Sequence, residues 1–158
     1  VFPFRSAHAG YCFECTRYER RLSQSHAWKT SMRHHGIDIF NLANETIAIR
    51  HDGVKGVGWL TIVDDRFVKE LGGPKKIREA LPESVEILAV KGGLLFKAGP
   101  RPKFGDTNRR DRLPEYKAVY KLVKPLAERA TERCPALTLG EVDSKDRTHS
   151  WLRRFDDA

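Results

Sequence analysis

The sequence predicts a single α+β domain, residues 1–158, in which a mixed or antiparallel sheet packs with several helices. A chain of 158 residues is long enough to bury one core and short enough to form one domain. Helix and strand patterns are interspersed without a regular strand–helix–strand repeat, which argues against a doubly wound sheet. Strand patterns at 85–90 and 94–98 are joined by Lys91-Gly92-Gly93, a tight turn typical of an antiparallel hairpin.

The N-terminal part of the chain gives the weakest pattern. Residues 1–35 indicate the edge of a strand or of a helix, through Tyr11, Phe13, Tyr18 and Leu22. Residues 36–40 alternate apolar and polar side chains and therefore predict a short strand. Within residues 41–53, Ile47 and Ile49 alternate in the same way.

The centre of the chain predicts a strand followed by two short helices. Residues 57–63 are rich in β-branched and aromatic side chains, which predicts a strand buried on both faces. Asp64 can cap a helix that ends near Gly72 and shares one apolar face among Phe67, Val68 and Leu71. A second helix begins at Gly73-Pro74, ends before Pro82, and is expected to turn inward Ile77, Ala80 and Leu81.

Two further helices are expected in the C-terminal part. Apolar residues at helical spacing predict a helix over 115–131, with Pro125 bending it or breaking its hydrogen bonding locally. A short terminal helix carries Trp151, Leu152 and Phe155 on one face and is expected to pack on the domain. Trp59 is also expected in the core.

The positive charge of the chain lies in two blocks. The formal net charge is +8; residues 1–35 hold six Lys/Arg against two Asp/Glu, and residues 97–124 hold nine against three. The stretches 36–96 and 125–158 carry −1 each. This asymmetry is typical of a protein that binds an acidic partner, either nucleic acid or an acidic protein face.

Residues 97–116, KAGPRPKFGDTNRRDRLPEY, are too long and too charged for a simple turn. Three prolines and two glycines stiffen and bend the stretch, and six Lys/Arg crowd it. The candidate partner-binding residues come from it: Arg101, Lys103, Phe104, Arg109, Arg110 and Arg112.

The cysteines and the lack of targeting patterns indicate the cellular compartment of the protein. Cys12, Cys15 and Cys134 make an odd count, which argues against a disulfide framework and favours a reducing compartment. No apolar stretch approaches a membrane span, and no signal peptide opens the chain, so we expect a cytoplasmic protein that does not enter a membrane. A zinc site would join Cys12 and Cys15 to His34 and His35, but adjacent histidines rarely both bind one ion, so neither a metal nor a cofactor is expected.

The motifs of the common enzyme classes are missing from the sequence. No GxSxG, HExxH or phosphate-binding glycine loop occurs, and the six histidines have no convincing catalytic partners. Asp64 and Asp65 could form an acid pair, but Asp64 is better explained as a helix cap. Asp106, Asp111 and Glu115 could hold a divalent metal, although pairing with neighbouring arginines explains them better. We therefore expect a protein without catalytic activity.

Nucleic-acid binding is the main alternative. Phe104, Tyr116 and Tyr120 are interleaved with lysines and arginines, and rings can stack on bases while cations bind phosphates. However, Tyr116 and Tyr120 lie one helical turn apart on a helix that needs its apolar face for the core. Packing is therefore the better explanation for one or both tyrosines.

Three stretches resemble the bacterial type VI immunity family. These are GWLTIVDDRFVKELGG at 58–73, GGLLFKAGPRPKFGDTNRRDRLPEYKAVYKLVKPL at 92–126 and WLRRFD at 151–156. Residues 35–38 also resemble a short Pro-Gly-Leu-Asp-like segment of that family, with histidine replacing proline. The resemblance implies that the family's shared scaffold includes Gly99, Pro100, Pro102, Gly105, Asp106, Asn108, Pro114 and Tyr116.

The resemblance implies that the chain is an antidote that binds and neutralises a cognate toxin effector, with nuclease toxins as the expected partners. Because the chain is basic, it is not expected to mimic DNA; it would occlude the toxin or disturb its assembly by docking on an acidic patch. Family members are usually longer at the N-terminus, so the chain resembles a shortened member or a fragment, truncated within residues 1–35. The resemblance says nothing of its oligomeric state.

Overall fold

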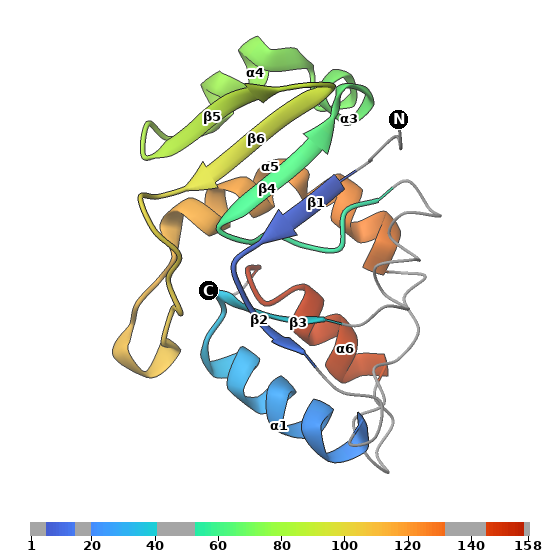
Figure 1. Cartoon of the computed structure of the whole chain (residues 1–158), viewed down its shortest axis with the longest axis vertical. Coiled ribbons are helices and arrows are strands. Elements are labelled where there is room, and N and C mark those ends of the chain that lie inside the picture. Colours follow the sequence, from blue (N-terminus) through green and yellow to red (C-terminus); the bar gives the residue numbers. More distant parts are fainter. Residues whose placement is uncertain (1–5, 15–19, 41–52, 132–144, 157–158) are drawn as a thin grey trace.

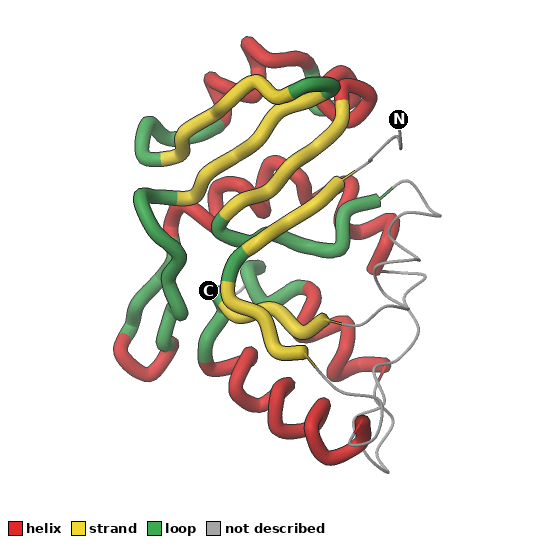
Figure 2. The backbone as a smooth tube through the Cα atoms, in the orientation of Figure 1, coloured by secondary structure: helices red, strands yellow, loops and turns green. Residues whose placement is uncertain are grey.

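The main element of the fold is a four-stranded sheet. The computed structural model describes residues 6–14, 20–40, 53–131 and 145–156. The sheet has the order β1 (Ser6–Ala9), β4 (Leu60–Asp64), β6 (Gly93–Ala98) and β5 (Val85–Val90), and every neighbouring pair is antiparallel (Figures 1 and 2). The predicted hairpin is confirmed as β5–β6, with Gly92 at φ 85° in the turn between them.

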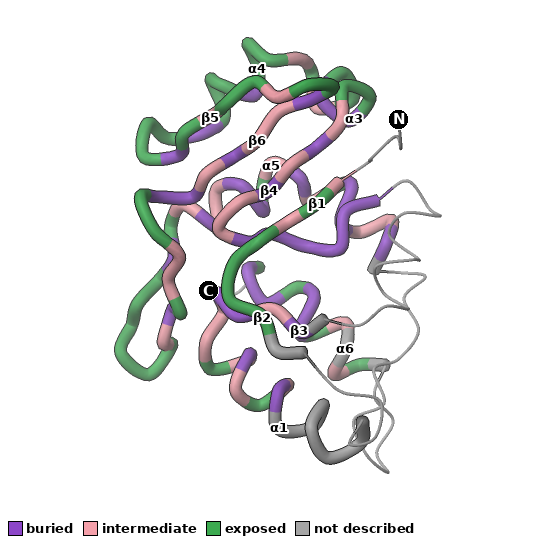
Figure 3. The backbone as a smooth tube through the Cα atoms, viewed as in Figure 1, coloured by how far each residue is buried: buried purple, intermediate pink, exposed green. Residues whose placement is uncertain are grey.

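The described helices cover only one face of this sheet. Thr61 and Val63 on β4 are fully buried, whereas Leu60 and Ile62, which alternate with them along the strand, are half-buried (Figure 3). Figure 1 shows α5 (Pro114–Thr131) behind the sheet and no described helix in front of it. The prediction of a strand buried on both faces was therefore wrong, because helices cover this sheet from one side.

The predicted central helices are confirmed as α3 (Asp65–Glu70) and α4 (Gly73–Ala80). The carboxylate of Asp64 accepts a hydrogen bond of 2.8 Å from the N–H of Phe67, so Asp64 is the predicted N-cap. In α4, Ile77 is buried as predicted and Leu81 follows it into the core. Ala80 was predicted to turn inward but is exposed, because Ile77 and Leu81 already fill that side of the helix.

A second layer lies on the far side of α5. It contains β2 (Tyr11–Glu14), α1 (Arg20–Arg33), β3 (Ile37–Phe40) and α6 (Lys145–Leu152). Strands β2 and β3 pair in parallel, and α1 is the crossover between them. The predicted strand at 36–40 is confirmed as β3. The predicted terminal helix is α6, but it ends at Leu152, so Phe155 lies in the turn that follows and not on the helix. Ile47, Ile49 and Tyr18 lie outside the described residues.

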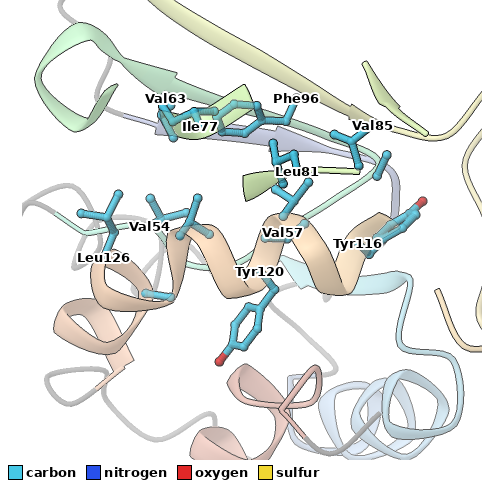
Figure 4. Close-up of a cluster of buried hydrophobic side chains, with 14 of the residues drawn as sticks. Val54, Val57, Val63, Ile77, Leu81, Val85, Phe96, Tyr116, Tyr120 and Leu126 are labelled. Atoms are coloured by element: carbon cyan, nitrogen blue, oxygen red, sulfur yellow. The ribbon is translucent and has the colours of Figure 1, made fainter. Parts of the chain in front are cut away.

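Helix α5 connects the two layers. It continues through Pro125, and some of its buried side chains face the four-stranded sheet while others face the second layer. Figure 4 shows Val57, Val63 and Phe96 on the sheet side of α5, while Tyr120 points from α5 toward the C-terminal segment. There the ring of Tyr120 packs on Phe155, with 5.7 Å between centroids. The predicted burial of Trp151, Leu152 and Phe155 is confirmed; Trp59 is half-buried against the core.

A candidate partner-binding surface

Residues 99–113, which we call the basic loop, connect β6 to α5. Two hydrogen bonds from the core hold the first part of the loop, at Gly99 and at Lys103. The indole Nε1 of Trp59 donates a hydrogen bond of 3.0 Å to the carbonyl of Gly99. Further along, the backbone N–H of Lys103 donates one of 3.1 Å to the hydroxyl of Tyr116 on α5. Figure 1 shows the loop running along the edge of the domain from β6 to α5. Tyr116 is therefore buried in the core and also holds the loop.

The turn after α1 holds the middle of the basic loop. The N–H of Gly36 donates to the carbonyl of Phe104 (2.9 Å), and the N–H of His35 donates to that of Gly105 (3.3 Å). A Cβ atom built on Gly36 would lie 2.0 Å from the carbonyl oxygen of Lys103. No side chain fits in that space, so glycine at position 36 allows the two backbones to approach this closely.

Asp106 fixes the local shape of the loop. Its carboxylate accepts hydrogen bonds from Nε (3.1 Å) and Nη2 (2.9 Å) of Arg33 on α1. It also accepts one from the N–H of Asn108 (3.0 Å), capping the 3-10 turn η1 (Thr107–Arg109). The hydrogen bonds from Arg33 lower the pKa of Asp106 to about 2. Pairing of Asp106 with nearby arginines was predicted, and Arg109 does lie 3.8 Å away, but the bidentate partner Arg33 was missed.

Phe104 projects from the loop as part of an exposed aromatic pair. It is 50% exposed and stacks on Tyr11 of β2, which is 38% exposed, with 4.1 Å between ring centroids and 16° between planes. The ring of His34 meets the edge of Phe104 at 6.2 Å. Exposed stacked rings are typical anchors in protein interfaces.

The predicted cationic residues of the loop do not form one cluster. Arg101, Arg109, Arg110 and Arg112 are all exposed (Figure 3), while Lys103 is half-buried, with Nζ 4.0 Å from Glu115. Arg110 and Arg112 lie together around a pocket of about 300 Å³. Arg101 and Lys103 are not among the residues that line it.

Comparison with known families identifies the chain. A family model described as "Type VI immunity for VRR-NUC" (TsiV) matches residues 1–155. The chain belongs to this family. The family resemblance inferred from the sequence is thus confirmed.

Among solved structures, this TsiV-family chain is similar to "Pseudomonas aeruginosa T6SS protein PA0821", with a TM-score of 0.79 and 19% sequence identity. The match covers 96% of this chain and 43% of that one, so the chain spans less than half the length of that relative. At this identity the likeness shows the shared fold. No curated protein matches the chain.

The residues that the sequence analysis missed form an ion cluster inside this immunity-family domain. Asp38 of β3 lies 2.7 Å from Nε2 of His8, 2.9 Å from Nζ of Lys55 and 4.0 Å from Nη2 of Arg154. Lys55 also donates to the carbonyl of Ile39 at 2.7 Å. Burial alone would raise the pKa of Asp38, but the charges of Lys55, His8 and Arg154 hold it well below its ordinary value.

The cluster joins segments from four parts of the chain. His8 comes from β1, Asp38 from β3, Lys55 from the segment before β4, and Arg154 from the end that follows α6. The side chains of Lys55 and Arg154 are each 2% exposed, and the Arg154 guanidinium lies 4.7 Å from the Trp151 ring centroid. In the sequence, the only sign of this ion cluster is Lys55, the single charged residue within the mostly apolar run 53–63.

The metal sites and the acid pair considered in the sequence analysis are not formed by the described residues. Among those residues, no group of three His, Cys, Asp or Glu side chains could hold a metal ion. Asp106 is engaged with Arg33, and Asp64 caps α3. Cys12 is exposed, while Cys15 and Cys134 lie outside the described residues. In the segments that the structure describes, no helix is both long and apolar enough to span a membrane.

Proposed function

We propose that this chain binds a VRR-NUC-type nuclease toxin and neutralises it through the basic loop and the Phe104–Tyr11 pair. The family description names the kind of toxin, and the structure offers a surface of suitable chemistry. The protein acts by binding, without catalysis, in the cytoplasm of the cell that it protects.

The observation that carries this proposal is an exposed aromatic pair beside arginines that have no acidic partner. Among the described residues, Arg101, Arg110 and Arg112 form no ion pair, although they lie on the loop that presents Phe104. Arginine and aromatic side chains are the usual energetic anchors of interfaces. Leaving three arginines unpaired in the free protein keeps them available to an acidic partner.

The way the loop is held favours tight binding. Hydrogen bonds to Trp59, Tyr116 and Gly36 fix its backbone before a partner arrives, so little ordering entropy is lost on binding. Opposite charge on the toxin would speed association. Because the DNA groove of a nuclease is cationic, a cationic surface fits an acidic patch outside that groove, from which it blocks access or disturbs toxin assembly.

Nucleic-acid binding is the less favoured function. Tyr116 and Tyr120 are each 1% exposed, so two of the three rings that could have stacked on bases are in the core. The remaining ring, Phe104, is already stacked on Tyr11. The described structure therefore offers no row of free rings along a cationic groove, which single-strand binders use.

Co-expression with the nuclease encoded beside this protein tests the proposal. We expect growth rescue and co-purification of the two proteins, and a loss of both when Arg109 and Arg110 are reversed to Glu or Phe104 is replaced by Ala. Lys75→Glu, an exposed charge reversal on α4, is the matched control and should behave as wild type. Because the loop arginines are exposed, the melting temperatures should stay nearly unchanged.

Three results would count against the proposal. A toxic neighbouring nuclease that is neither neutralised nor bound by the wild-type protein would remove the immunity function. A large loss of stability in the Arg109/Arg110 variant with unchanged affinity would show that these arginines are structural. A gel shift with DNA or RNA at moderate salt would favour the nucleic-acid alternative instead.

A further inference from the structure

The pocket beside Arg110 and Arg112 has the composition of an anion site. It has a volume of about 300 Å³, at the lower end of the range of roughly 300–1,000 Å³ for ligand pockets. It is lined by His35, Thr107, Arg110, Asp111, Arg112, Leu113, Lys117 and Phe155. Leu113 and Phe155 are buried and are the two large apolar side chains of the lining, alongside four charged ones.

The cations around the pocket are not neutralised within the protein. In residues 6–14, 20–40, 53–131 and 145–156, no ion pair joins a carboxylate to Arg110, Arg112 or Lys117. Asp111 is the single acidic residue of the lining, against three Lys/Arg. The lining of the pocket therefore carries more positive than negative charge.

Arg110 is held in a strained backbone conformation at the pocket. Its φ is 57° and its ψ is 27°, and among the described non-glycine residues it alone has a positive φ. The position follows η1, where glycine is the residue usually found. Arginine is sterically unfavourable in this conformation, so its presence here points to a function for the side chain.

His35 lines the pocket and is also in contact with Arg154 of the buried ion cluster. Its ring meets Phe155 edge to face at 6.0 Å, and its carbonyl accepts a hydrogen bond of 2.9 Å from Nε of Arg154. Burial lowers the pKa of His35, and the charges of Arg154 and Lys117 lower it further. A hydrogen bond with the Met32 backbone acts in the opposite direction but does not outweigh them. An anion in the pocket would offset those charges, which makes the imidazole a reporter of occupancy.

We propose that this pocket binds a carboxylate side chain presented by an acidic segment of the protein partner. The carboxylate lies between Arg110, Arg112 and Lys117, and its methylene groups pack on Leu113 and Phe155. The identity of the partner rests on the proposed function, whereas the chemistry of the pocket does not depend on it.

The shape of the site favours a carboxylate over the phosphates of a nucleic acid. A nucleic-acid backbone follows a continuous groove of cations with rings for its bases, as in single-strand binding proteins. Here three cations line one small pocket, and the same lining includes the buried apolar side chains of Leu113 and Phe155.

Titration of the isotope-labelled protein with small probes tests the pocket directly. The probe is the capped tripeptide acetyl-Gly-Glu-Gly-amide, and its Gln counterpart is the matched control. We expect saturable shifts of the Lys117 and Arg110 amide resonances and a higher His35 pKa with the Glu peptide, and neither effect with the Gln peptide. Equal shifts with both peptides, or none with either, would overturn the proposal.

Two further arms of the titration separate the possible sources of the anion. Inorganic phosphate and a short single-stranded oligonucleotide are added in place of the peptide at the same ionic strength. Tighter binding of the oligonucleotide than of the Glu peptide would show a nucleic-acid site and overturn the assignment. The Lys117→Ala variant should lose at least about tenfold in affinity for the Glu peptide, and Lys121→Ala, on the same helix outside the pocket, should lose none.

The same variants in the nuclease complex separate a failure of the pocket from a failure of the proposed function. If the wild-type protein binds the nuclease, Arg112→Ala and Lys117→Ala should each weaken binding roughly tenfold, with Lys121→Ala as the control. Unchanged affinity in the two pocket variants would remove the pocket from the interface while leaving the immunity function intact. If the wild type does not bind the nuclease, the proposed function fails, and the peptide titration still decides whether the pocket takes a carboxylate.

Discussion

The carboxylate of Asp38 lies 2.9 Å from the ammonium of Lys55 inside the protein, where the two side chains are 13% and 2% exposed. Because Asp38 is on β3 and Lys55 precedes β4, this pair connects the small parallel sheet to the four-stranded sheet. His8 and Arg154 complete the charge balance around Asp38. Removing one member of such a cluster leaves the remaining buried charges less well compensated.

We therefore expect Lys55→Met to destabilise the protein by about 3–5 kcal/mol. The methionine fills similar space, so the loss reports the missing cation beside the Asp38 carboxylate rather than a cavity. The matched control is Lys97→Met, which breaks an equally short ion pair of 2.8 Å with Glu86 whose side chains are 30% and 52% exposed. That change should alter stability by less than about 1 kcal/mol. Urea unfolding of the two variants measures both effects, and equal losses would contradict the expected importance of burial.

The Asp38 carboxylate also predicts how stability depends on pH. The charges of Lys55, His8 and Arg154 hold its pKa in the folded protein well below the ordinary value. In the unfolded chain the Asp38 carboxylate binds a proton near pH 4, whereas in the folded protein it stays ionised at that pH. Its contribution to stability is therefore complete above that pH and is lost as the pH decreases further. Asp106 contributes in the same direction, since hydrogen bonds from Arg33 lower its pKa to about 2.

Melting temperatures between pH 7 and pH 2 measure this dependence. Asp38→Asn should melt lower than wild type at pH 7, because Lys55 loses its partner, and should lose less stability than wild type as the pH falls below 4. Parallel curves for the two proteins would show that Asp38 does not titrate as its surroundings imply.

The sequence predicted those parts of the fold in which local pattern and packing agree. The β5–β6 hairpin, the Asp64-capped α3 and the apolar face of α5 all follow from residues close together in the chain. Helix α1 was missed because it is polar and shows almost no apolar periodicity. The β2–β3 pairing was missed because it joins short strands separated by that helix.

The candidate surface was predicted in composition but not in geometry. The sequence identified Phe104 and the loop arginines, because basic and aromatic residues concentrate there. It could not show that Tyr11 stacks on Phe104, or that Arg33 binds Asp106, because both contacts join distant segments. The pocket likewise needs His35 and Phe155 from outside the loop.

Gly36 is expected to be essential for holding the basic loop. A Cβ atom there would lie 2.0 Å from the Lys103 carbonyl oxygen, so Gly36→Ala must separate the two backbones and break the hydrogen bond to Phe104. We expect a loss of about 1–3 kcal/mol in stability and faster amide exchange in residues 103–106. Gly56→Ala is the control, because no atom lies within 4 Å of its added Cβ. Similar stability of the two variants would show that the loop is not held at Gly36.

Replacing Arg110 by glycine should raise stability and weaken carboxylate binding. Glycine adopts the positive φ of 57° without steric strain, so Arg110→Gly is expected to stabilise the folded protein by about 1 kcal/mol, even though glycine also gains freedom in the unfolded chain. Arg112→Gly, two residues on and without a positive φ, should instead lose stability. Both variants remove a cation from the same pocket, so both should weaken carboxylate binding. Thermal unfolding and the Glu-peptide titration measure the two effects, and an Arg110→Gly variant that is less stable than wild type would show that Arg110 supports the fold rather than straining it.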